Sequence, residues 1–420
     1  MDATDFDVVV VGAGCAGSAT ALLLAKAGHR VLMADRAAFP RDKLSTLYIQ
    51  QRGVAYLARW GLLDRVAAVC PALGRVSYRI DDVCLEGRSR PVEGVADAYA
   101  PRRHWLDATL AEAAVAAGVE FRDGCAVEDL IRTGDRVTGV RLRTRGSASP
   151  VVVERARLVV GADGMRSTVA ARAGATSLIE HPPQTCVYYT YWAGVSDRFE
   201  LYETAGQWVG AVPTNDGATL VQAYFPQAEF RRVRADAMTA YLDNVRTVAP
   251  DLHVRMLAGG RLDRIYGTGE QRNFFRTAAG PGWALVGDAG HHHDSITARG
   301  ISDAFMQAQM LADRVTGQLD DPMALDKAVA AYARDRDDAL IDDYYDTLST
   351  ARLSVPPHRL AMLREVAADP ARTEEFFTAM AGYPAPRGPH GGAESISRGL
   401  AWMRQNKQGS AQRRPGPATR

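Results

Sequence analysis

FDVVVVGAGCAG, residues 6–17, is the stretch that decides the fold of this 420-residue chain. Residues 6–11 form an apolar, β-branched run of strand length, which is typical of a strand buried on both faces. Three glycines follow in the pattern G-x-G-x-x-G, and residues 16–27 then have the composition of a helix. Residues 30–34 return to an apolar strand, so the stretch predicts a βαβ unit.

Each glycine of this pattern has its own task. The first allows a tight turn, the second lets the backbone approach a pyrophosphate, and the third lets helix and strand pack closely. The helix N-terminus offers free N–H groups to the phosphates, and an acid at the end of the second strand accepts ribose hydroxyls. The unit predicts a dinucleotide site but does not distinguish NAD from FAD. Its predicted contact residues are Gly12, Gly14, Ala16, Gly17, Asp35 and Arg36.

Composition excludes several classes of protein. A formal net charge of +1 gives no attraction to nucleic acid. The five cysteines are scattered without a C-x-x-C pair, which favours reduced thiols and a cytoplasmic location. The N-terminus lacks the basic region of a signal peptide. Residues 8–24 are uncharged, but their glycine pattern indicates strand, turn and helix, so we expect no membrane span.

Two further motifs identify the dinucleotide. VGADGMRS, residues 160–167, and WALVGDAG, residues 283–290, each join a predicted strand to the segment that follows it. They resemble the DG and GD motifs of the flavoprotein monooxygenase superfamily. That superfamily includes p-hydroxybenzoate hydroxylase-like enzymes, geranylgeranyl reductases and flavin-dependent halogenases. The resemblance spans roughly residues 5–350 and implies noncovalently bound FAD, with NADPH or NADH as the reductant.

The resemblance also implies roles for single residues. Asp288, after Gly287, corresponds to the residue that binds the FAD ribitol, and Gly300 and Ile301 would present backbone N–H groups to the flavin pyrimidine ring. Arg103 corresponds to an arginine near the FAD phosphates. Asp163 and Gly164 belong to a loop associated with FAD placement and NAD(P)H access.

The fold class that we expect is α/β plus α+β. A Rossmann-like FAD-binding domain with a discontinuous chain is predicted over residues 1–175 and 276–320. Alternating, aromatic-rich strands predict an antiparallel-sheet substrate domain over residues 176–275. A helical C-terminal region is expected over 321–402, followed by a disordered basic tail over 403–420.

The substrate side of the site is less defined. On the strand with Tyr189 and Tyr191 alternate side chains face opposite sides, and we expect one face, with Trp208, to line a pocket over the flavin. His292, His293 and Arg299 are the candidates for proton transfer or substrate contact. We expect no metal, because consecutive histidines point in different directions and no distant acid or cysteine pattern completes a site.

The leading functional hypothesis is a monooxygenase that hydroxylates or epoxidises a small, secondary-metabolite substrate with O₂ through a flavin C4a-hydroperoxide. The alternatives are a geranylgeranyl reductase-like C=C reductase, a redox-neutral FAD-dependent cyclase and a halogenase. Leu44-Ser45-Thr46 replaces the cysteine and glycines that many of the reductases carry, and Gly210 replaces the second tryptophan of the halogenase W-x-W-x-I-P motif. Electrons come from NAD(P)H directly or from a separate flavin reductase.

Overall fold

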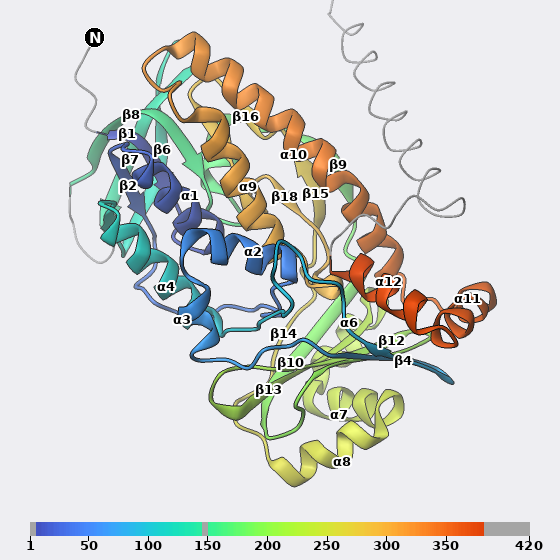
Figure 1. Ribbon diagram of the computed structural model, residues 1–420. Helices are drawn as coiled ribbons and strands as arrows, with labels where there is room; N and C mark the ends of the chain where they lie inside the picture. Colours follow the sequence, from blue (N-terminus) through green and yellow to red (C-terminus); the bar gives the residue numbers. More distant parts are fainter. Residues whose placement is uncertain (1–5, 145–149, 382–420) are drawn as a thin grey trace, which may run out of the picture.

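The computed structural model describes residues 6–144 and 150–381, and these form two large sheets with helices around them (Figure 1). The predicted tail over 403–420 and the end of the predicted helical region lie outside the described residues. The mixed architecture confirms the expected fold class: a largely parallel nucleotide-binding sheet, a mainly antiparallel second sheet and a set of C-terminal helices.

The first sheet is built from segments far apart in the sequence. β1 lies at its centre because its valines are buried on both faces, and it pairs in parallel with β2 and β8. The sheet order is β16-β17-β8-β1-β2-β5, with β7 pairing with β8 and with β6. The strands are β1 (Phe6–Val11), β2 (Val31–Ala34), β5 (Glu120–Arg122), β6 (Cys125–Thr133), β7 (Arg136–Thr144), β8 (Val152–Gly161), β16 (Ala279–Gly280) and β17 (Trp283–Leu285).

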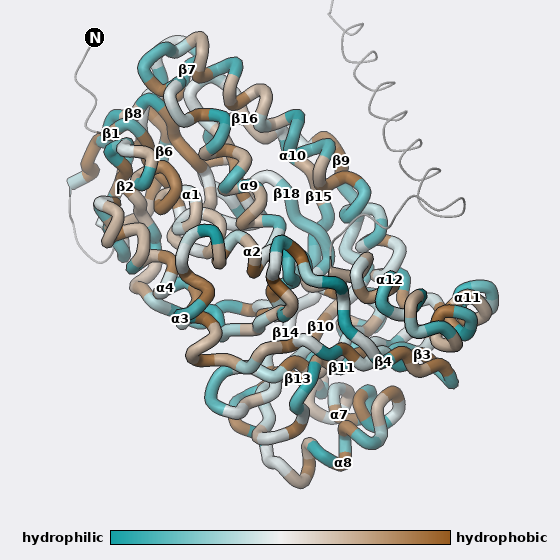
Figure 2. Tube along the Cα trace, viewed as in Figure 1, coloured by the Kyte–Doolittle hydropathy of each residue, from teal (hydrophilic) through white to brown (hydrophobic). Residues whose placement is uncertain are grey.

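Helices cover this sheet. One face packs against α1 and its neighbours in a single apolar core, and the other face packs against the β6–β7 hairpin and α5. In Figure 2 the tube is brown around β1 and β6 but teal around β15 and β18, so a hydrophilic stretch lies inside the fold. The helices are α1 (Cys15–Lys26), α2 (Gln51–Trp60), α3 (Leu63–Ala67), α4 (Arg103–Ala116), α5 (Thr168–Ala173), α9 (Gly300–Val315) and α10 (Pro322–Thr350).

The second sheet has the order β14-β10-β13-β12-β11-β3-β4 and is antiparallel except for the β3–β11 pair. Its residues alternate as predicted: Tyr189 and Tyr191 join one apolar cluster, while Tyr188 and Trp192 join the cluster beneath α7 (Ala237–Val248) and α8 (Pro250–Gly259). The strands are β3 (Val76–Ile80), β4 (Val83–Gly87), β10 (Thr185–Ala193), β11 (Phe199–Thr204), β12 (Gln207–Pro213), β13 (Ala218–Pro226) and β14 (Tyr266–Thr268).

The remaining elements cover this sheet or link it to the first. A small sheet, β18-β15-β9, runs between the two large sheets, and α11 and α12 pack near β4. The bounds are β9 (Ser177–His181), β15 (Asn273–Arg276), β18 (His291–His292), α6 (Phe230–Ala235), α7 (Ala237–Val248), α8 (Pro250–Gly259), α11 (Pro357–Ala367) and α12 (Pro370–Met380).

One segment lies where the sequence pattern did not place it. Residues 76–87, β3 and β4, belong to the second sheet, although the predicted nucleotide-binding unit included them. The parallel partner of β3 is β11, more than a hundred residues later, and local patterning carries no information about such pairing. The exact domain limits remain a prediction.

Candidate functional site

A cavity of about 510 Å³ extends from the glycine loop of the first sheet to the second sheet. Its lining includes most of the residues predicted from the motifs, namely Gly12, Gly14, Ala16, Asp35, Arg36, Arg103, Asp163, Gly164, Gly287, Asp288, Gly300 and Ile301. Gly17 lies outside the lining. The chain therefore brings the three separate motifs together around one space.

The glycine loop is packed too closely for any side chain. Gly12 has φ +105°, and a Cβ there would lie 2.5 Å from the carbonyl oxygen of Ala162. A Cβ on Gly17 would lie 1.8 Å from the carbonyl oxygen of Gly12. Gly17 thus allows α1 to approach the strand end, which is the task that the pattern predicts for the third glycine.

Asp35 holds this loop in shape. One carboxylate oxygen accepts a hydrogen bond from the Ala13 N–H at 2.9 Å, and the other accepts from the Ala37 N–H at 2.9 Å. The side chain is buried at the end of β2 and lines the cavity beside exposed Arg36. A carboxylate can accept further hydrogen bonds at its remaining lone pairs, so the position still suits a ribose.

Two cations lie beside the glycine loop. A Cβ on Gly14 would be 3.1 Å from Lys43 Nζ and 3.6 Å from Arg103 Nη2. Both cations contact fully buried Asp107, Arg103 at 3.0 Å and Lys43 at 3.8 Å. Cations and free N–H groups at one point favour the phosphates of a dinucleotide. Lys43 was not among the predicted site residues; it lies in the loop that follows β2.

Cys15, inside the loop, is not a redox centre. Its thiol donates to Asp107 Oδ1 at 3.1 Å and is buried. Burial raises the pKa of Cys15 far above its usual range, so the thiol stays protonated at neutral pH.

Replacing Lys43 by glutamine is expected to weaken FAD binding by about tenfold, because a charge-assisted hydrogen bond contributes about 1.5 kcal/mol or more. Fluorescence titration of the FAD-free protein measures this affinity. Lys327→Gln, on the exposed face of α10, is the matched control and should leave the affinity unchanged. Unchanged affinity in Lys43→Gln would place the phosphates elsewhere.

The DG and GD loops follow two neighbouring parallel strands, β8 and β17, and both line the cavity. Asp163 accepts hydrogen bonds from the start of α5: from the hydroxyl of the N-cap residue Ser167 at 2.5 Å and from the Thr168 N–H at 2.6 Å. Burial raises the pKa of Asp163, and these hydrogen bonds offset only part of that effect. Because the carboxylate is already engaged within the chain, its predicted cofactor role remains a prediction.

Gly287 needs to be a glycine. Its φ is +60°, and a Cβ there would lie 2.8 Å from the Ala16 Cβ. Its N–H donates to Gln307 Oε1 at 2.9 Å, so Gln307 on α9 sets the loop that presents exposed Asp288 to the cavity. Gln307 was not predicted, because a glutamine inside a helix carries no local signal of such a role.

The N-terminus of α9 opens onto the same space. Gly300 is its first residue, and a Cβ added there would meet no atom of the described chain within 4 Å. Gly300 and Ile301 both line the cavity. The first N–H groups of a helix have no intrahelical acceptor, so these can donate to a ligand. This arrangement fits the flavin contact that the resemblance implies.

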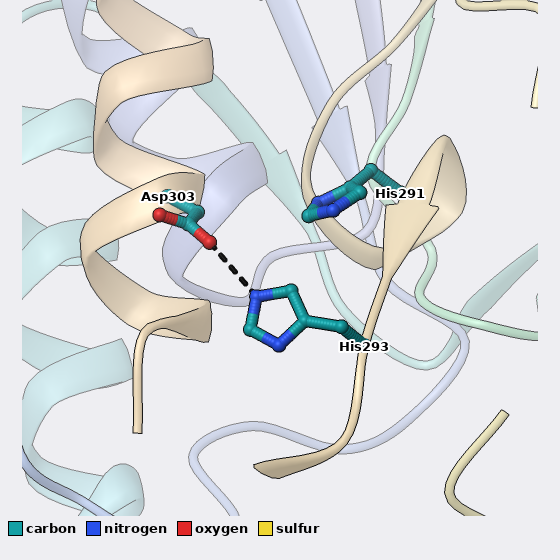
Figure 3. A group of neighbouring side chains, drawn as sticks. All are labelled: His291, His293 and Asp303. Atoms are coloured by element: carbon teal, nitrogen blue, oxygen red, sulfur yellow. Dashed lines mark hydrogen bonds and ion pairs between the residues drawn. The ribbon is translucent and has the colours of Figure 1, made fainter. Parts of the chain in front are cut away.

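The three histidines face two directions. His291 and His293 lie on one side of β18, with ring centroids 5.1 Å apart, and point toward α9 (Figure 3). His293 Nε2 lies 3.0 Å from Asp303 Oδ2, and a ligand atom from each of the three residues falls within 4.8 Å of the others. His292 faces the other way and stacks on Phe274. The expectation that no distant acid joins the histidines is therefore wrong, because α9 supplies Asp303.

The ionisation of this cluster is set by its neighbours. Burial lowers the pKa of His291 well below its usual range, and its Nε2 has no hydrogen-bond partner in the described part of the chain. Burial alone would raise the pKa of Asp303, but Arg52 and His293 outweigh burial and hold it at about 2. The cluster therefore contains a neutral imidazole and an ionised carboxylate at neutral pH.

Only some of the residues predicted for the substrate side line the cavity. His292 and His293 line the cavity, whereas Arg299 does not; it is buried and forms an ion pair with Asp343 on α10. Tyr189 lines the cavity, but Tyr191 and Trp208 do not.

The two excluded aromatic side chains have other neighbours. Tyr191 packs under the Arg102 guanidinium at 4.3 Å, and Trp208 packs beside Tyr78 at 5.8 Å. A direct pocket role for these two residues thus lacks geometric support, while that for Tyr189 remains a prediction.

The second sheet adds polar groups that sequence patterning missed. Tyr224 Oη lies 2.9 Å from Ser295 Oγ, which in turn donates to Gln271 Oε1 at 2.7 Å. Gln222 lies beside them in the lining. Finding these residues required the pairing of β10, β12 and β13, which no single strand reveals.

Comparisons with known proteins agree with this geometry. The family model described as FAD binding domain matches residues 5–340. Kynurenine 3-monooxygenase of Salinispora arenicola is 30% identical, and the alignment covers 86% of this chain and 83% of that protein. Digeranylgeranylglycerophospholipid reductase of Methanosarcina mazei is 28% identical over 73% of this chain and 74% of its own length.

Among solved structures, the flavin-dependent brominase Bmp2 superposes with a TM-score of 0.79. The alignment covers 96% of this chain and 100% of the brominase at 19% identity. At that identity the likeness concerns the fold alone.

Proposed function

We propose, from the premise that this chain belongs to the FAD binding domain family, that it is a monooxygenase acting on a small organic, secondary-metabolite substrate by hydroxylation or epoxidation. The predicted membership in the flavoprotein monooxygenase superfamily is confirmed, and the protein is an FAD-dependent oxidoreductase. NADPH or NADH is the reductant typical of this family. What is proposed is the reaction and the class of substrate.

One observation carries the proposal: the FAD motifs and the second sheet share a single cavity. Its sheet end is lined by Val187, Tyr189, Gln222 and Tyr224, with Thr268 and Gln271 beside them. An apolar and aromatic lining with a few polar groups is typical of pockets for small organic ligands. A substrate held there lies between the sheet and the flavin.

The bound FAD supplies the electron transfer and the activation of O₂. The residues of the chain bind and orient the substrate and exclude water from the site. Tyr189 and Tyr224 have pKa values raised chiefly by burial, so both phenols are neutral hydrogen-bonding groups. Tyr189 also stacks on Tyr266, with ring centroids 5.6 Å apart, which makes a flat wall for an aromatic substrate. No side chain needs to act as a nucleophile.

A C=C reductase is the second candidate, supported by the likeness to the Methanosarcina mazei reductase. Halogenation is disfavoured because Trp208 lies outside the cavity lining and Gly210 stands where the second tryptophan of that motif is expected. A redox-neutral cyclase has no residue-level support.

Product analysis under ¹⁸O₂ separates the candidates. The proposal expects one labelled oxygen atom in the product for each NAD(P)H consumed. Two added hydrogens without label would identify a reductase, and rearranged product without consumption of NAD(P)H would identify a redox-neutral enzyme. Either of these results overturns the monooxygenase proposal.

Replacing Tyr224 by phenylalanine is expected to raise KM for the substrate about fivefold and to leave reduction of the flavin by NAD(P)H unchanged. The reason is the loss of one hydrogen-bonding hydroxyl at the sheet end, worth about 1 kcal/mol. Steady-state kinetics measure the change. Tyr191→Phe, on a neighbouring strand but outside the cavity lining, is the control and should behave as wild type. Equal changes of KM in both variants would show that Tyr224 does not contact the substrate.

We further propose that the protein takes electrons from NAD(P)H itself; a separate flavin reductase is the alternative source. We also propose that the protein is cytoplasmic. Within residues 6–144 and 150–381, no helix has the length and apolarity needed to cross a membrane. The five cysteines are all unpaired, as expected for a reducing compartment.

A further inference from the structure

The hydrogen bonds behind the sheet end of the cavity can run in only one direction. Two backbone N–H groups set that direction: the N–H of Ser295 donates to Gln271 Oε1 at 3.2 Å, and the N–H of Ile296 donates to Asp294 Oδ1 at 3.1 Å. A backbone N–H can only donate, so both of these oxygens are acceptors. The side-chain amide of Gln271 therefore turns its oxygen toward Ser295.

The nitrogen of the same amide agrees with this orientation. Gln271 Nε2 donates to Thr185 Oγ1 at 2.8 Å and to Asp294 Oδ1 at 3.2 Å. The Thr185 hydroxyl donates in turn to Asp294 Oδ2 at 2.7 Å. The opposite orientation of the amide would place its oxygen against Asp294 Oδ1 and its NH₂ group against the Ser295 N–H. Gln271, Thr185 and Asp294 are all buried, where such unpaired polar groups are costly, so the orientation is fixed.

The direction of the next two hydrogen bonds follows from this orientation. Ser295 Oγ lies 2.7 Å from Gln271 Oε1, which carries no hydrogen, so the serine hydroxyl is the donor. Tyr224 Oη lies 2.9 Å from Ser295 Oγ. Because the serine hydrogen is already used, the phenol hydrogen of Tyr224 must lie between these two oxygens. Gln222 Oε1, the other acceptor near the phenol, is farther away at 3.3 Å. Tyr224 Oη thus has only lone pairs left for a ligand.

Tyr224 presents these lone pairs at the sheet end of the cavity. The residues around its hydroxyl, Ser295, Gln222 and Gln271, line the cavity with it. The strand register places Tyr189 on β10 directly opposite Gln222 on β13, two residues from Tyr224. These three side chains therefore share one face of the second sheet. A flat aromatic wall and a fixed hydrogen-bond acceptor lie next to each other on that face.

We propose that the site selects a substrate that carries a hydrogen-bond donor, a hydroxyl or N–H group on an aromatic body, and that this donor binds Tyr224 Oη; the inference rests on the function proposed above. A carbonyl, ether or carboxylate oxygen in the same place would set lone pairs against lone pairs and leave Tyr224 unsatisfied. Sites built to bond a substrate O–H or N–H discriminate strongly against analogues that lack it. Tyr224 determines specificity here, and Ser295 and Gln271 are positioning residues that act through it.

The test is calorimetric titration of the FAD-bound protein with two probes: 2-naphthol, which carries a donor, and 2-methoxynaphthalene, which carries only an acceptor. Wild type should bind 2-naphthol about tenfold more tightly, the effect of one hydrogen bond. Tyr224→Phe should bind the two probes within about twofold of each other, because neither can then bond to residue 224. Ratios within each variant are compared, so that differences in probe size and hydrophobicity cancel.

Ser295→Ala tests the direction of the hydrogen bonds themselves. Without the serine oxygen the phenol of Tyr224 is free to donate to the ether, so the preference for 2-naphthol should fall to about threefold or less. A purely structural role of Ser295 would weaken both probes equally and leave this ratio unchanged. Tyr191→Phe, outside the cavity lining, is the control and should keep the wild-type ratio.

Four results would overturn the inference: equal affinity of wild type for the two probes, a wild-type ratio in Tyr224→Phe, a wild-type ratio in Ser295→Ala, or no binding of either probe to wild type. Circular dichroism verifies that each variant is folded. The titrations need neither NAD(P)H nor O₂. A failure of the ¹⁸O₂ experiment would therefore reject the monooxygenase reaction without affecting them, and equal probe affinities would reject the donor selectivity without affecting the reaction.

Discussion

Gly17→Ala is expected to yield a protein that binds FAD at least about a hundredfold more weakly than wild type. A Cβ at this position would lie 1.8 Å from the carbonyl oxygen of Gly12 and 3.1 Å from the Ala162 Cβ. The closer neighbour is backbone, which cannot rotate away as a side chain can. Helix α1 must therefore move off the glycine loop, and its N-terminal N–H groups move away from the phosphates with it.

Fluorimetric titration with FAD measures the change, and circular dichroism verifies that the variant is folded. Gly210→Ala on β12 is the control, because its new Cβ would meet only Leu201 Cδ2 at an ordinary 3.7 Å. That variant should bind FAD as wild type does. A folded Gly17→Ala protein with wild-type affinity would show that the loop does not hold the cofactor.

Asp303→Asn is expected to lower the free energy of unfolding by about 3–5 kcal/mol, the usual cost of removing one partner from a buried ion pair. The carboxylate is fully buried between His293 and Arg52, so its loss leaves the Arg52 guanidinium without its buried counter-ion and His293 Nε2 without its carboxylate partner. Because the pKa of Asp303 is held at about 2, this stabilisation is fully present above pH 4. It is lost only as the pH falls through 2.

Urea unfolding at equal, saturating FAD and again without FAD measures this effect and separates it from changes in ligand binding. Asp335→Asn serves as the control, because its pair with Arg314 is 37% and 50% exposed on the two side chains. Exposed pairs contribute about 0–1 kcal/mol. Similar losses in the two variants would mean that burial gives the Asp303–Arg52 pair no special role in stability.

The cofactor end of the site could be predicted from the sequence because its determinants are local. Neighbouring residues in the sequence suffice to identify the glycine loop, Asp35 and the GD loop. The structure places all three around one cavity. The role of Gly17 could be predicted without knowing the ligand, because this residue allows α1 to pack closely against the strand. The resemblance to a known superfamily then selected FAD, which the family match confirms.

The substrate end could not be predicted to the same depth. Tyr189, Gln222 and Tyr224 meet only through the pairing of strands, and nothing along one strand indicates its register with another. Tyr191 and Trp208 were reasonable aromatic candidates, but Tyr191 packs under Arg102 instead and Trp208 lies in an apolar cluster outside the cavity lining. The same limit hid the contribution of β3 to the second sheet.

The histidine run shows a third kind of limit. Sequence placed His292 and His293 near the substrate but could not reveal that Asp303, ten residues later on a helix, returns to contact His293. Nor could it reveal Arg52 and Asp343, which come from two other helices. The protonation of a histidine depends on such partners, so it becomes predictable only once the fold is known.

The visible spectrum of the purified protein, before and after anaerobic NADPH and then after O₂, tests the central claim most directly. The account predicts flavin absorption bands that bleach with NADPH and return when O₂ is admitted. It also predicts that denaturation releases the flavin as free FAD. A protein that shows no flavin bands, even after FAD is added, would contradict the account at its foundation. If NADPH does not bleach the bands, a separate reductase must deliver the electrons. That result would contradict our proposal that NAD(P)H reduces this protein directly.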